Sequence, residues 1–329
     1  MTPSHASKRI LVTGGAGYIG SNTVLQLLDR GYDVVVVDNL SRGYRHNVAP
    51  ERLRELSLQD TAALVRVFEE APCSAVIHFA AFISVGESMQ QPEIYFENNV
   101  GGSLSLFTAM QQVGVKNVVF SSTAAVYGMP EVSPIPETLP FAPINPYGES
   151  KVMVEKILGW FDRIHGIRSV CLRYFNASGA DPKGRAGEEH DPETHLIPLL
   201  FHAIPSGEPV TVFGEDYPTP DGTCIRDYIH VTDLAQAHIL ALEALAGGAA
   251  SNKFNVGTGF GFSVREVIQA VENVTGKKVP YKVGPRREGD PPALVADSTK
   301  LRSTLGWSPK YGDLRAIVSS AWNFAESKK

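Results

Sequence analysis

The chain has 329 residues, 43% of them hydrophobic and 20% charged, which is enough apolar material for one large domain or two closely packed ones. Its net charge of -5 argues against general affinity for nucleic acid or anionic membranes. No apolar run approaches the roughly 18 residues of a membrane-spanning helix. Because the three cysteines are far apart, we expect reduced thiols and therefore a cytoplasmic protein.

Short β-branched runs alternate with longer amphipathic segments through the first half of the chain. The expected strands cover residues 9–13, 33–38, 75–80, 117–122 and 169–175. The expected helices cover residues 18–30, 61–70, 92–113 and 147–165. This alternation is typical of a parallel sheet with helices on both faces.

From about residue 177 the chain becomes rich in glycine, proline and charge, which predicts a loop region that opens a second lobe. A helix at 230–245 followed by a buried strand at 253–257 then returns to the main sheet. Ser263 and Glu266 have the spacing of a capping box at the start of a further helix.

The stretch VTGGAGYIG at 12–20 stands between the first expected strand and the first helix. Gly14, Gly17 and Gly20 permit a tight turn and close approach of a pyrophosphate to the backbone, at a helix N-terminus that favours negative charge. Asp38 ends the second strand, where a carboxylate can accept hydrogen bonds from the adenosine ribose and repel a 2′-phosphate. The sequence therefore predicts NAD rather than NADP.

Tyr147 and Lys151 are four residues apart, so both lie on one face of the helix that follows Asn145 and Pro146. We expect the ammonium to stabilise the phenolate and lower the pKa of the phenol, which would make Tyr147 a base. An ordinary surface pair at helical spacing is the alternative, and the neighbouring motifs decide between the two.

Several motifs carry a family resemblance. TGGAGYIG, SSTAAVYG and PYGESK together resemble motifs of the extended short-chain dehydrogenase/reductase family. The later motifs RYFNASGA, RDYIHVTDLA and PRREGDPP resemble those of the UDP-glucose (UDP-galactose) 4-epimerases within that family. The similarity runs in register from about residue 9 to 325.

The resemblance implies a catalytic set of Thr123, Tyr147 and Lys151. The Thr123 hydroxyl would bond the reacting sugar oxygen, and Tyr147 would accept the proton of the sugar 4-hydroxyl. Lys151 would bond the nicotinamide ribose and, with the positive nicotinamide, depress the pKa of Tyr147. C4 would pass its hydride to NAD, and the 4-keto sugar would then turn its other face to receive the hydride again, which inverts C4.

Further cofactor contacts implied by the resemblance lie in the glycine loop and after later strands. With the catalytic three, they are Gly14, Gly17, Tyr18, Ile19, Gly20, Asp38, Asn39, Ser41, Phe79, Ala80, Ala81, Asn98, Tyr174 and Phe175. Core packing alone is the alternative for Phe79 and Ala80. Paired asparagines are poor helix formers, which favours a specific contact at Asn98 and Asn99.

A UDP-sugar carries a diphosphate, and a protein of net negative charge needs fixed cations to hold it. The resemblance assigns this role to Arg226 and Arg287, whose guanidinium groups suit phosphate oxygens, and assigns the uridine ribose to Asp290. The other implied UDP-sugar contacts are Thr123, Tyr147, Asn176, His195, Leu196, Thr211, Phe213, Tyr228 and Leu294. A buried core role is the alternative for His195, Phe213 and Tyr228, and no metal ligand is expected.

The predicted fold class is α/β, a Rossmann-type doubly wound parallel sheet with a smaller C-terminal α/β substrate lobe. We expect an NAD-binding domain at residues 1–176, to which 230–258 returns. The UDP-sugar-binding lobe is expected at 177–229 and 259–329. The resemblance also implies a homodimer through the helices near 92–113 and 147–165.

Three alternatives are weighed. A 4,6-dehydratase needs an acid/base pair directly after the threonine, and Ala124 and Ala125 at those places argue against dehydration. A 4-epimerase of a UDP-pentose or a UDP-uronic acid stays open, since the same hydride return would serve. The resemblance places Leu294 where a residue sets the room around the C2 substituent, and its intermediate size predicts a preference for glucose and galactose with partial tolerance of N-acetylhexosamines. A non-catalytic NAD-binding regulator would not need Thr123 and Tyr147 beside a lysine.

Overall fold

The computed structural model describes residues 9–287 and 289–328, which form two compact units. The first comprises residues 9–128, Phe141–Arg173 and Ala235–Phe254. The second comprises Met129–Pro140, Tyr174–Leu234 and the remainder from residue 255. The units thus begin and end close to the expected domain limits, with one exception.

The exception is the segment 129–140, which we expected in the first domain and which belongs to the second unit. The backbone N–H of Ile135 donates to Val295 O at 2.8 Å, and the Glu137 carboxylate accepts from the N–H of Asn255 at 2.8 Å. These partners are more than 100 residues away in the chain, so local sequence patterns did not reveal them.

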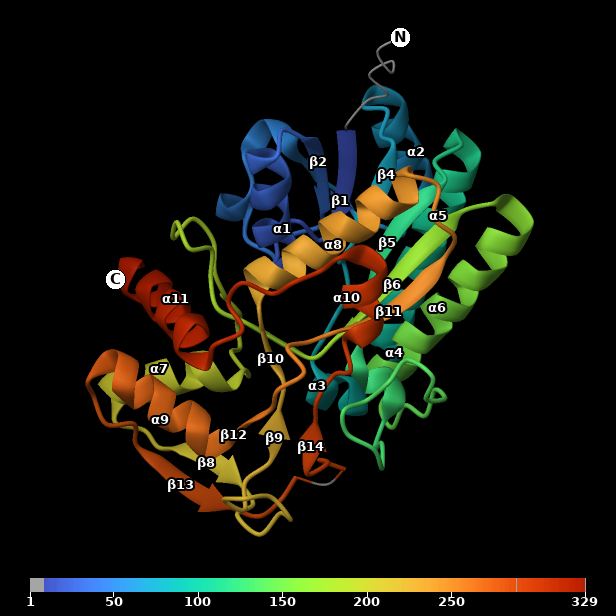
Figure 1. Ribbon diagram of the computed structural model, residues 1–329. Coiled ribbons are helices and arrows are strands. Elements are labelled where there is room, and N and C mark those ends of the chain that lie inside the picture. The colour runs from blue at the N-terminus through green and yellow to red at the C-terminus, as the bar shows by residue number, and fades with distance from the viewer. Residues whose placement is uncertain (1–8, 288, 329) are drawn as a thin grey trace. The chain divides into compact units, whose positions relative to one another are not determined.

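A seven-stranded sheet forms the centre of the first unit, in the order β3-β2-β1-β4-β5-β6-β11 (Figure 1). Its strands are β1 (Arg9–Thr13), β2 (Asp33–Asp38), β3 (Leu53–Glu55), β4 (Ala75–His78), β5 (Asn117–Thr123), β6 (Arg168–Tyr174) and β11 (Asn252–Val256). β1 pairs in parallel with β2 and β4, and the β2–β3 and β4–β5 pairs are parallel too. This is the strand order of the doubly wound dinucleotide-binding fold, so the predicted fold class is confirmed.

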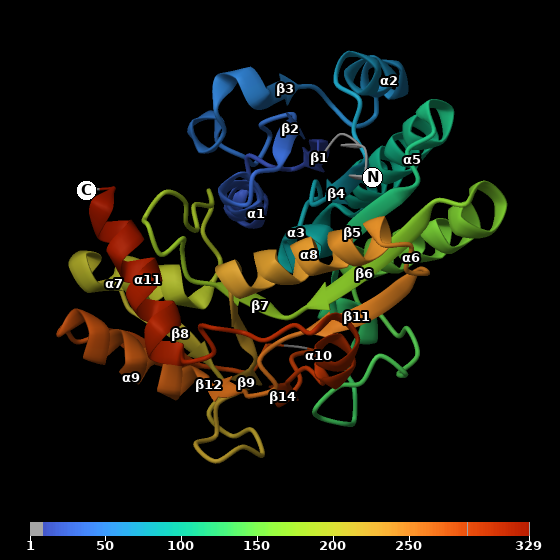
Figure 2. The ribbon, with the colours of Figure 1, turned by 45° about the horizontal axis from the view of Figure 1, so that its top comes forward.

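Helices cover both faces of this sheet. They are α1 (Tyr18–Asp29), α2 (Thr61–Glu70), α3 (Val85–Gln90), α4 (Pro92–Tyr95), the π-helical η3 (Phe96–Gly101), α5 (Gly102–Val113), α6 (Pro146–His165) and α8 (Val231–Ala246), with 3₁₀ turns η1 (Arg45–Asn47), η2 (Pro50–Arg52) and η4 (Ala124–Tyr127). Figure 2 shows α1 and α8 on one side of the strands and α2, α5 and α6 on the other. The helix expected at 92–113 is therefore three successive helical segments, with a π turn at its two asparagines.

The core under α2, α5 and α6 explains the continuous apolar runs of the strands. Its members include Leu11, Val37, Val76, Val118 and Phe120 from the sheet and Leu64, Phe68, Leu106, Phe107, Met110 and Leu158 from the helices. Burial of each such side chain contributes about 1.5–3 kcal/mol. This packing holds the carboxyl ends of β1, β4 and β5 at one edge, where open α/β sheets bind their ligands.

The second unit contains three small sheets and four helices among its described residues. The pairs β7 (Asn176–Ser178) with β10 (Tyr228–His230) and β8 (Val210–Phe213) with β13 (Tyr281–Gly284) are parallel. β9 (Ile225–Arg226) lies between β12 (Phe262–Ser263) and β14 (Ala293–Leu294). The helices are α7 (Leu196–Ser206), α9 (Val264–Thr275), α10 (Thr299–Leu305) and α11 (Leu314–Ser327).

The core of the second unit lies between α7, α9 and α11. Leu200, Val271 and Ile317 are fully buried there. Helix α9 begins with the expected capping box, since Ser263 and Glu266 each bond the other's backbone N–H. Within the part of the chain that the structure describes, no helix combines the length and the apolarity that crossing a membrane would require.

Candidate active site

The glycine loop between β1 and α1 has a backbone that side chains would obstruct. Gly14 has a φ of +69°, and a Cβ there would lie 2.5 Å from the backbone nitrogen of Ala80. A Cβ at Gly20 would lie 2.1 Å from Gly14 O. Gly17 is the N-cap of α1 and offers no side-chain cap to the first turn, where Tyr18 and Ile19 lie. The loop therefore presents helix N–H groups that an anion can approach closely.

Asp38 ties the end of β2 to this loop. Its Oδ2 accepts from the N–H of Ala16 at 2.9 Å, and its Oδ1 accepts from the N–H of Leu40 at 2.9 Å. Burial raises the pKa of Asp38, and these two hydrogen bonds act against that rise. Each oxygen keeps a second lone pair for a ribose hydroxyl. Beyond it, Asn39 Oδ1 accepts from the N–H and the hydroxyl of Ser41.

The segment after β4 lies directly beside the glycine loop. The N–H of Phe79 donates to Thr13 O at 3.0 Å, and its ring lies 4.6 Å from the ring of His238. Ala80 is the residue against Gly14, and Ala81 follows it half-buried. The predicted cofactor residues of β1, β2 and β4 thus come together at one edge of the sheet.

Asn99 connects three segments around this edge. Its Oδ1 accepts from the N–H of Phe82 at 2.8 Å, and its Nδ2 donates to Phe82 O and to Ser150 Oγ, both at 3.1 Å. The predicted contact residue Asn98 donates to Asn99 Oδ1 at 3.0 Å. The poor helix propensity of the asparagine pair predicted a specific contact at Asn98 or Asn99. The structure places most of these contacts on the buried Asn99. Ser150 had no sequence signal.

The N-terminus of α6 is built as expected. Asn145 caps the helix by accepting from the N–H of Gly148 at 2.8 Å, and Pro146 occupies the first turn. A Cβ at Gly148 would lie 2.7 Å from Ala125 O. The turn that carries Tyr147 therefore packs tightly against the segment that follows β5.

Thr123, Tyr147 and Lys151 come together in the first unit. Thr123 ends β5, and its Oγ1 accepts from the N–H of Ala125 at 3.1 Å. The Tyr147 hydroxyl is hydrogen-bonded to the Thr123 side chain. Lys151 lies one turn further along α6, where its Nζ donates to Ser121 O at 2.8 Å and lies 4.9 Å from the centre of the Phe120 ring.

The pKa values correct one expectation. Burial raises the pKa of Tyr147, and only the hydrogen bond with Thr123 acts against this rise. Burial lowers the pKa of Lys151 to about 7, although the charge of Glu155 opposes the shift. Lys151 is not among the groups that shift the pKa of Tyr147 in the protein alone, and its ammonium donates to the Ser121 carbonyl.

A buried ion pair behind α6 was not predicted. Arg173 on β6 donates to both carboxylate oxygens of Glu155, at 2.8 and 2.6 Å, and its Nη1 donates to the Tyr127 hydroxyl at 2.8 Å. The Ser122 hydroxyl donates to Glu155 at 2.6 Å. This network joins β5, η4 and β6 to α6.

In the second unit, Arg226 and Leu294 face each other in register across β9 and β14. Arg226 forms a salt bridge with Asp290 and donates to Pro291 O at 3.0 Å. The Arg287 guanidinium lies 3.9 Å from the centre of the Phe213 ring. The structure thus brings the two predicted phosphate-binding arginines close to residues predicted to contact uridine, and Asp290 is engaged by an arginine.

Other residues of this unit that were predicted to bind ligands lie in its core, in strands or directly after a strand. Tyr228 is buried in the core of the second unit, and it pairs in register with Asn176. Tyr174 ends β6, and Phe175 follows it; both are half-buried. Thr211 lies on β8, opposite Lys282. The core role weighed as the alternative for Tyr228 is therefore the one that its surroundings favour.

Asp227, between Arg226 and Tyr228, was also missed. Its buried carboxylate accepts from the N–H and the hydroxyl of Thr258, at 2.9 and 2.8 Å, and from the N–H groups of Gly259 and Ala296, both at 3.1 Å. Burial raises its pKa and these bonds oppose the rise. These four hydrogen bonds fix the backbone at the end of β9 and therefore the position of the Arg226 Cα, from which its side chain extends.

His195 and Leu196 stand at the start of α7, with His195 as the N-cap residue. The His195 Nδ1 lies 3.0 Å from Glu188 Oε1 and 3.1 Å from Glu193 Oε1. Burial lowers the pKa of His195, but the two glutamates outweigh burial and raise it to about 10. The half-buried Leu196 packs against the core of the unit.

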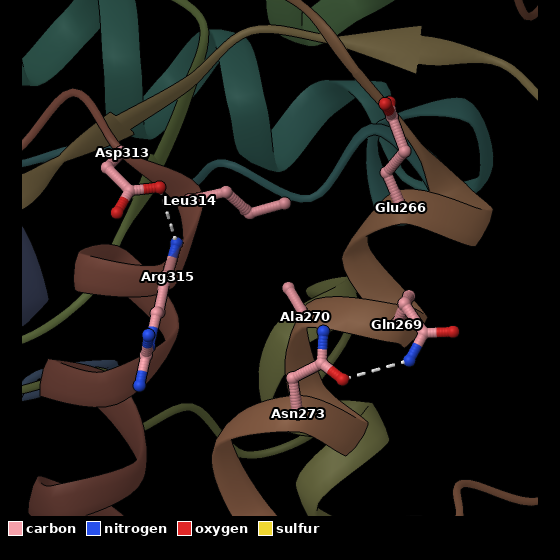
Figure 3. Close-up of a pocket in the computed structure, with 7 residues that line it drawn as sticks. All are labelled: Glu266, Gln269, Ala270, Asn273, Asp313, Leu314 and Arg315. Carbon is pink, nitrogen blue, oxygen red and sulfur yellow. Dashed lines mark hydrogen bonds between the residues drawn. The ribbon is translucent and has the colours of Figure 1, made fainter.

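A pocket of about 260 Å³ opens between α9 and the start of α11 (Figure 3). Two lining residues take part in helix capping: Asp313 accepts from the N–H of Arg315, and Glu266 belongs to the capping box of α9. The Gln269 amide donates to Asn273 at 3.1 Å (Figure 3). None of the predicted site residues lines it. We assign it no role in the chemistry.

Comparison with known proteins gives long, close matches. A UDP-glucose 4-epimerase from Lacticaseibacillus casei is 51% identical over 320 residues, which cover 97% of each chain. The crystal structure of UDP-glucose 4-epimerase from Brucella ovis in complex with NAD is 48% identical, with a TM-score of 0.93 over 96% of this chain and 98% of that one. The enzyme of the same name from Bifidobacterium longum, crystallised with NAD+ and UDP, is 38% identical, with a TM-score of 0.90 over 97% of this chain and 98% of that one.

The family match covers the segments that carry the glycine loop, Asp38 and the Thr123, Tyr147 and Lys151 group. The sequence model of the NAD dependent epimerase/dehydratase family matches residues 10–257. With that match and relatives of this similarity over nearly the full length, the chain belongs to the NAD dependent epimerase/dehydratase family.

Proposed function

We propose that this chain catalyses the NAD-dependent epimerisation of a UDP-hexose at C4, interconverting UDP-glucose and UDP-galactose. The observation that carries the proposal is the Tyr147 hydroxyl bonded to Thr123 at the carboxyl end of β5, with Lys151 one helical turn away. Relatives about 50% identical over nearly the full length are UDP-glucose 4-epimerases, which supports the same assignment.

The first unit fits the cofactor that the family requires. The glycine loop leaves no room for side chains at Gly14 and Gly20, and α1 presents its uncapped first turn there. We assign the pyrophosphate to this turn and the adenosine ribose to Asp38. NAD held by these residues would supply the hydride acceptor for C4 of the sugar and, after the 4-keto sugar has turned, the hydride donor to its opposite face.

Tyr147 takes the proton of the sugar 4-hydroxyl and gives it back after the sugar has turned. Thr123 holds the same oxygen through its hydroxyl. Because burial raises the pKa of Tyr147 in the protein alone, the base needs positive charge nearby. We assign that charge to Lys151, released from Ser121 to the nicotinamide ribose, together with the positive ring of the oxidised cofactor.

The second unit supplies the groups for the nucleotide part of the substrate. We assign the diphosphate to Arg226 and Arg287, and the uridine to Phe213 and Asp290. The Arg226 guanidinium contacts Asp290 and Pro291 O, so its orientation is fixed before any ligand binds. Leu294 stands opposite Arg226 in the register of the strands and is assigned to the sugar C2 side.

The direct test is to incubate the purified protein with UDP-galactose, without added NAD, and to follow UDP-glucose by chromatography. We expect conversion toward one equilibrium mixture from either sugar, with no net change in NADH. A protein that binds NAD but converts neither sugar would refute the proposal and support the regulator alternative.

We also propose a homodimer through α5 and α6. Met153, Trp160 and Ile164 form an exposed apolar stripe on α6, and Leu104 is exposed on α5. Light scattering should give a dimer for the wild type and a monomer for Trp160→Glu. Ala62→Glu, which adds the same charge to the exposed face of α2, should stay dimeric. A monomeric wild type at micromolar concentration would contradict this part.

The cytoplasm is the proposed location, because all three cysteines are free thiols. Fractionation of producing cells would test it, with the activity expected in the cytosolic fraction.

A further inference from the structure

Four ligand-type side chains converge in the segment that leads into α7. Glu188, His190, Glu193 and His195 each contribute one atom to a group in which all atoms lie within 4.8 Å of one another. Both glutamate side chains are only 7% exposed, so their charges are largely removed from water. Burying two carboxylates side by side is unfavourable unless cations lie between them.

The distances within this cluster suit a bound metal. His190 Nδ1 lies 3.4 Å from Glu188 Oε1 and 3.6 Å from Glu193 Oε2. His195 Nδ1 lies 3.0 Å from Glu188 Oε1 and 3.1 Å from Glu193 Oε1. With metal–ligand distances of about 2.0–2.2 Å, a tetrahedral site separates its ligand atoms by about 3.3–3.6 Å. The four histidine–glutamate separations of 3.0–3.6 Å are thus close to this range, with Glu193 facing each histidine through a different carboxylate oxygen.

Glu188 gives an independent observation. Its Oε1 is buried and has no partner in hydrogen-bond geometry among the residues that the structure describes. The Nδ1 atoms of His190 and His195 lie 3.4 and 3.0 Å from it as ion-pair contacts. A buried carboxylate oxygen without a hydrogen bond is unfavourable by a few kcal/mol. A cation bound between this oxygen and the two Nδ1 atoms would be coordinated by all three.

We propose that Glu188, His190, Glu193 and His195 form a divalent transition-metal site of the zinc type. Two imidazoles and two carboxylates are borderline ligands that suit Zn²⁺ better than Mg²⁺ or Ca²⁺, which prefer all-oxygen shells. Two carboxylates and one divalent ion leave the cluster neutral. This differs from the sequence-based expectation of no metal ligand, because the four residues have no standard spacing and meet only in the folded loop.

The site has a consequence for the proposed substrate-binding role of His195. A metal on Nδ1 fixes the tautomer in which Nε2 carries the proton. The ring is 42% exposed, so that N–H remains available as a donor to an oxygen of a bound ligand. The metal would also anchor the loop at residues 188–195 to the start of α7.

The test uses the full chain with NAD added and any affinity tag removed. Metal content after dialysis against equimolar ZnCl₂ is measured by plasma mass spectrometry, and thermal unfolding is recorded with and without Zn²⁺. We expect one Zn²⁺ per chain and a rise in Tm. In Glu188→Gln and His190→Gln, the affinity for Zn²⁺ should fall at least about 10-fold.

Matched controls remove similar groups nearby. Glu189→Gln changes a neighbouring carboxylate that pairs with Lys328, and His202→Gln changes an exposed histidine on α7. Both should keep wild-type metal content. Co²⁺ should give a visible spectrum of a four-coordinate ion in the wild type and in both controls, but not in Glu188→Gln.

Two results would overturn the proposal: less than about 0.1 Zn²⁺ per chain in the wild type, or equal Zn²⁺ uptake in the wild type and Glu188→Gln. Either would mean that the four residues form only an ion-pair cluster. Should Glu188→Gln fail to fold, judged by circular dichroism and NAD binding, Glu193→Gln gives the same comparison. None of these readouts depends on epimerase activity, so the two proposals fail separately.

Discussion

The proposed reaction centre of the first unit and the proposed diphosphate site of the second treat charge in opposite ways. In the first, burial shifts the groups around the proposed reaction centre toward their neutral forms: the pKa of Lys151 falls to about 7, that of His78 falls to about 3, and that of Tyr147 rises. In the second, charged groups face charged partners, as in the salt bridge between Arg226 and Asp290.

The difference matches the two tasks. A proton acceptor works best when its charge changes easily, and burial without a permanent counter-ion keeps that change responsive to a cofactor's charge. A holder of a diphosphate works best when its charge never changes, which favours arginine fixed by hydrogen bonds. Four substitutions test this contrast.

The largest effect should come from Tyr147→Phe, which removes the proton acceptor and keeps the ring. We expect kcat to fall by about 10³-fold, within the range for loss of a general base, with little change in KM. The assay is conversion of UDP-galactose to UDP-glucose. Tyr32→Phe, which removes an exposed hydroxyl bonded to Glu243, should retain wild-type kcat. A kcat for Tyr147→Phe within tenfold of the wild-type value would contradict the role of Tyr147 as the proton acceptor.

His78→Gln tests the neutral state of the first unit. His78 is buried between the hydroxyls of Thr13 and Ser103. Its pKa falls from 6.5 to about 3, first through burial and then through the charge of Lys151. Below pH 6.5, His78 becomes protonated in the unfolded chain but stays neutral in the folded chain. The free energy of unfolding therefore falls as the pH falls from 6.5 toward 3. Between pH 6.5 and 4.5 the loss is about 2 kcal/mol.

Urea unfolding at these two pH values measures the change. His78→Gln should lower stability at neutral pH but lack this part of the acid-induced loss. His46→Gln, at an exposed position, should keep the wild-type dependence. If His78→Gln and the wild type lose equal stability between the two pH values, His78 is not neutral in the folded protein.

Arg226→Met tests the fixed charge of the second unit. We expect KM for UDP-galactose to rise about 10- to 100-fold with kcat changed only a few-fold, because a charge-assisted hydrogen bond is worth about 1.5–3 kcal/mol. The double variant Arg226→Met/Asp290→Asn removes the carboxylate left without its partner. If the double variant regains wild-type KM, Arg226 serves Asp290 rather than the substrate. Arg286→Met, on an exposed pair with Asp216, is the control.

The smallest effect concerns the sugar. Leu294→Tyr should lower turnover of UDP-N-acetylglucosamine by about tenfold or more and leave UDP-glucose turnover within about threefold, since a methylene-scale change in a pocket is worth about 1–3 kcal/mol. The ratio of kcat/KM for the two sugars is the measurement. Complete rejection of the N-acetyl sugar by the wild type would contradict the expected tolerance.

The elements of the first unit were largely predictable, because β-branched runs such as DVVVVD and cap residues such as Asn145 are local signals. The short strand β3 (Leu53–Glu55) was not among the strands expected from β-branched runs, because three residues carry no periodicity. The same holds for the strands of the second unit, which have two to four residues each. Their pairing depends on long-range contacts such as that between Ile135 and Val295.

For the candidate site, motif resemblance identified residues but not their partners. It placed Lys151 toward the phenol, whereas the structure directs its ammonium to the Ser121 carbonyl. It could not supply the partner of Arg226, because Asp290 lies 64 residues away. The hydrogen bonds of Asp227 and the cluster around His195 form only when the loops have folded. Residue spacing in the sequence therefore does not predict them.

The π-helical turn η3 sets a limit on how this chain can change in length. Because Asn99 lies in that turn and bonds both Phe82 and Ser150, its angular position about the axis is fixed by one extra backbone residue. Deleting a single residue from Phe96–Gly101 would make the helix regular and swing the amide away by about 100°. A shorter chain at this point would therefore be a better helix and a poorer support for the turn that bears Tyr147.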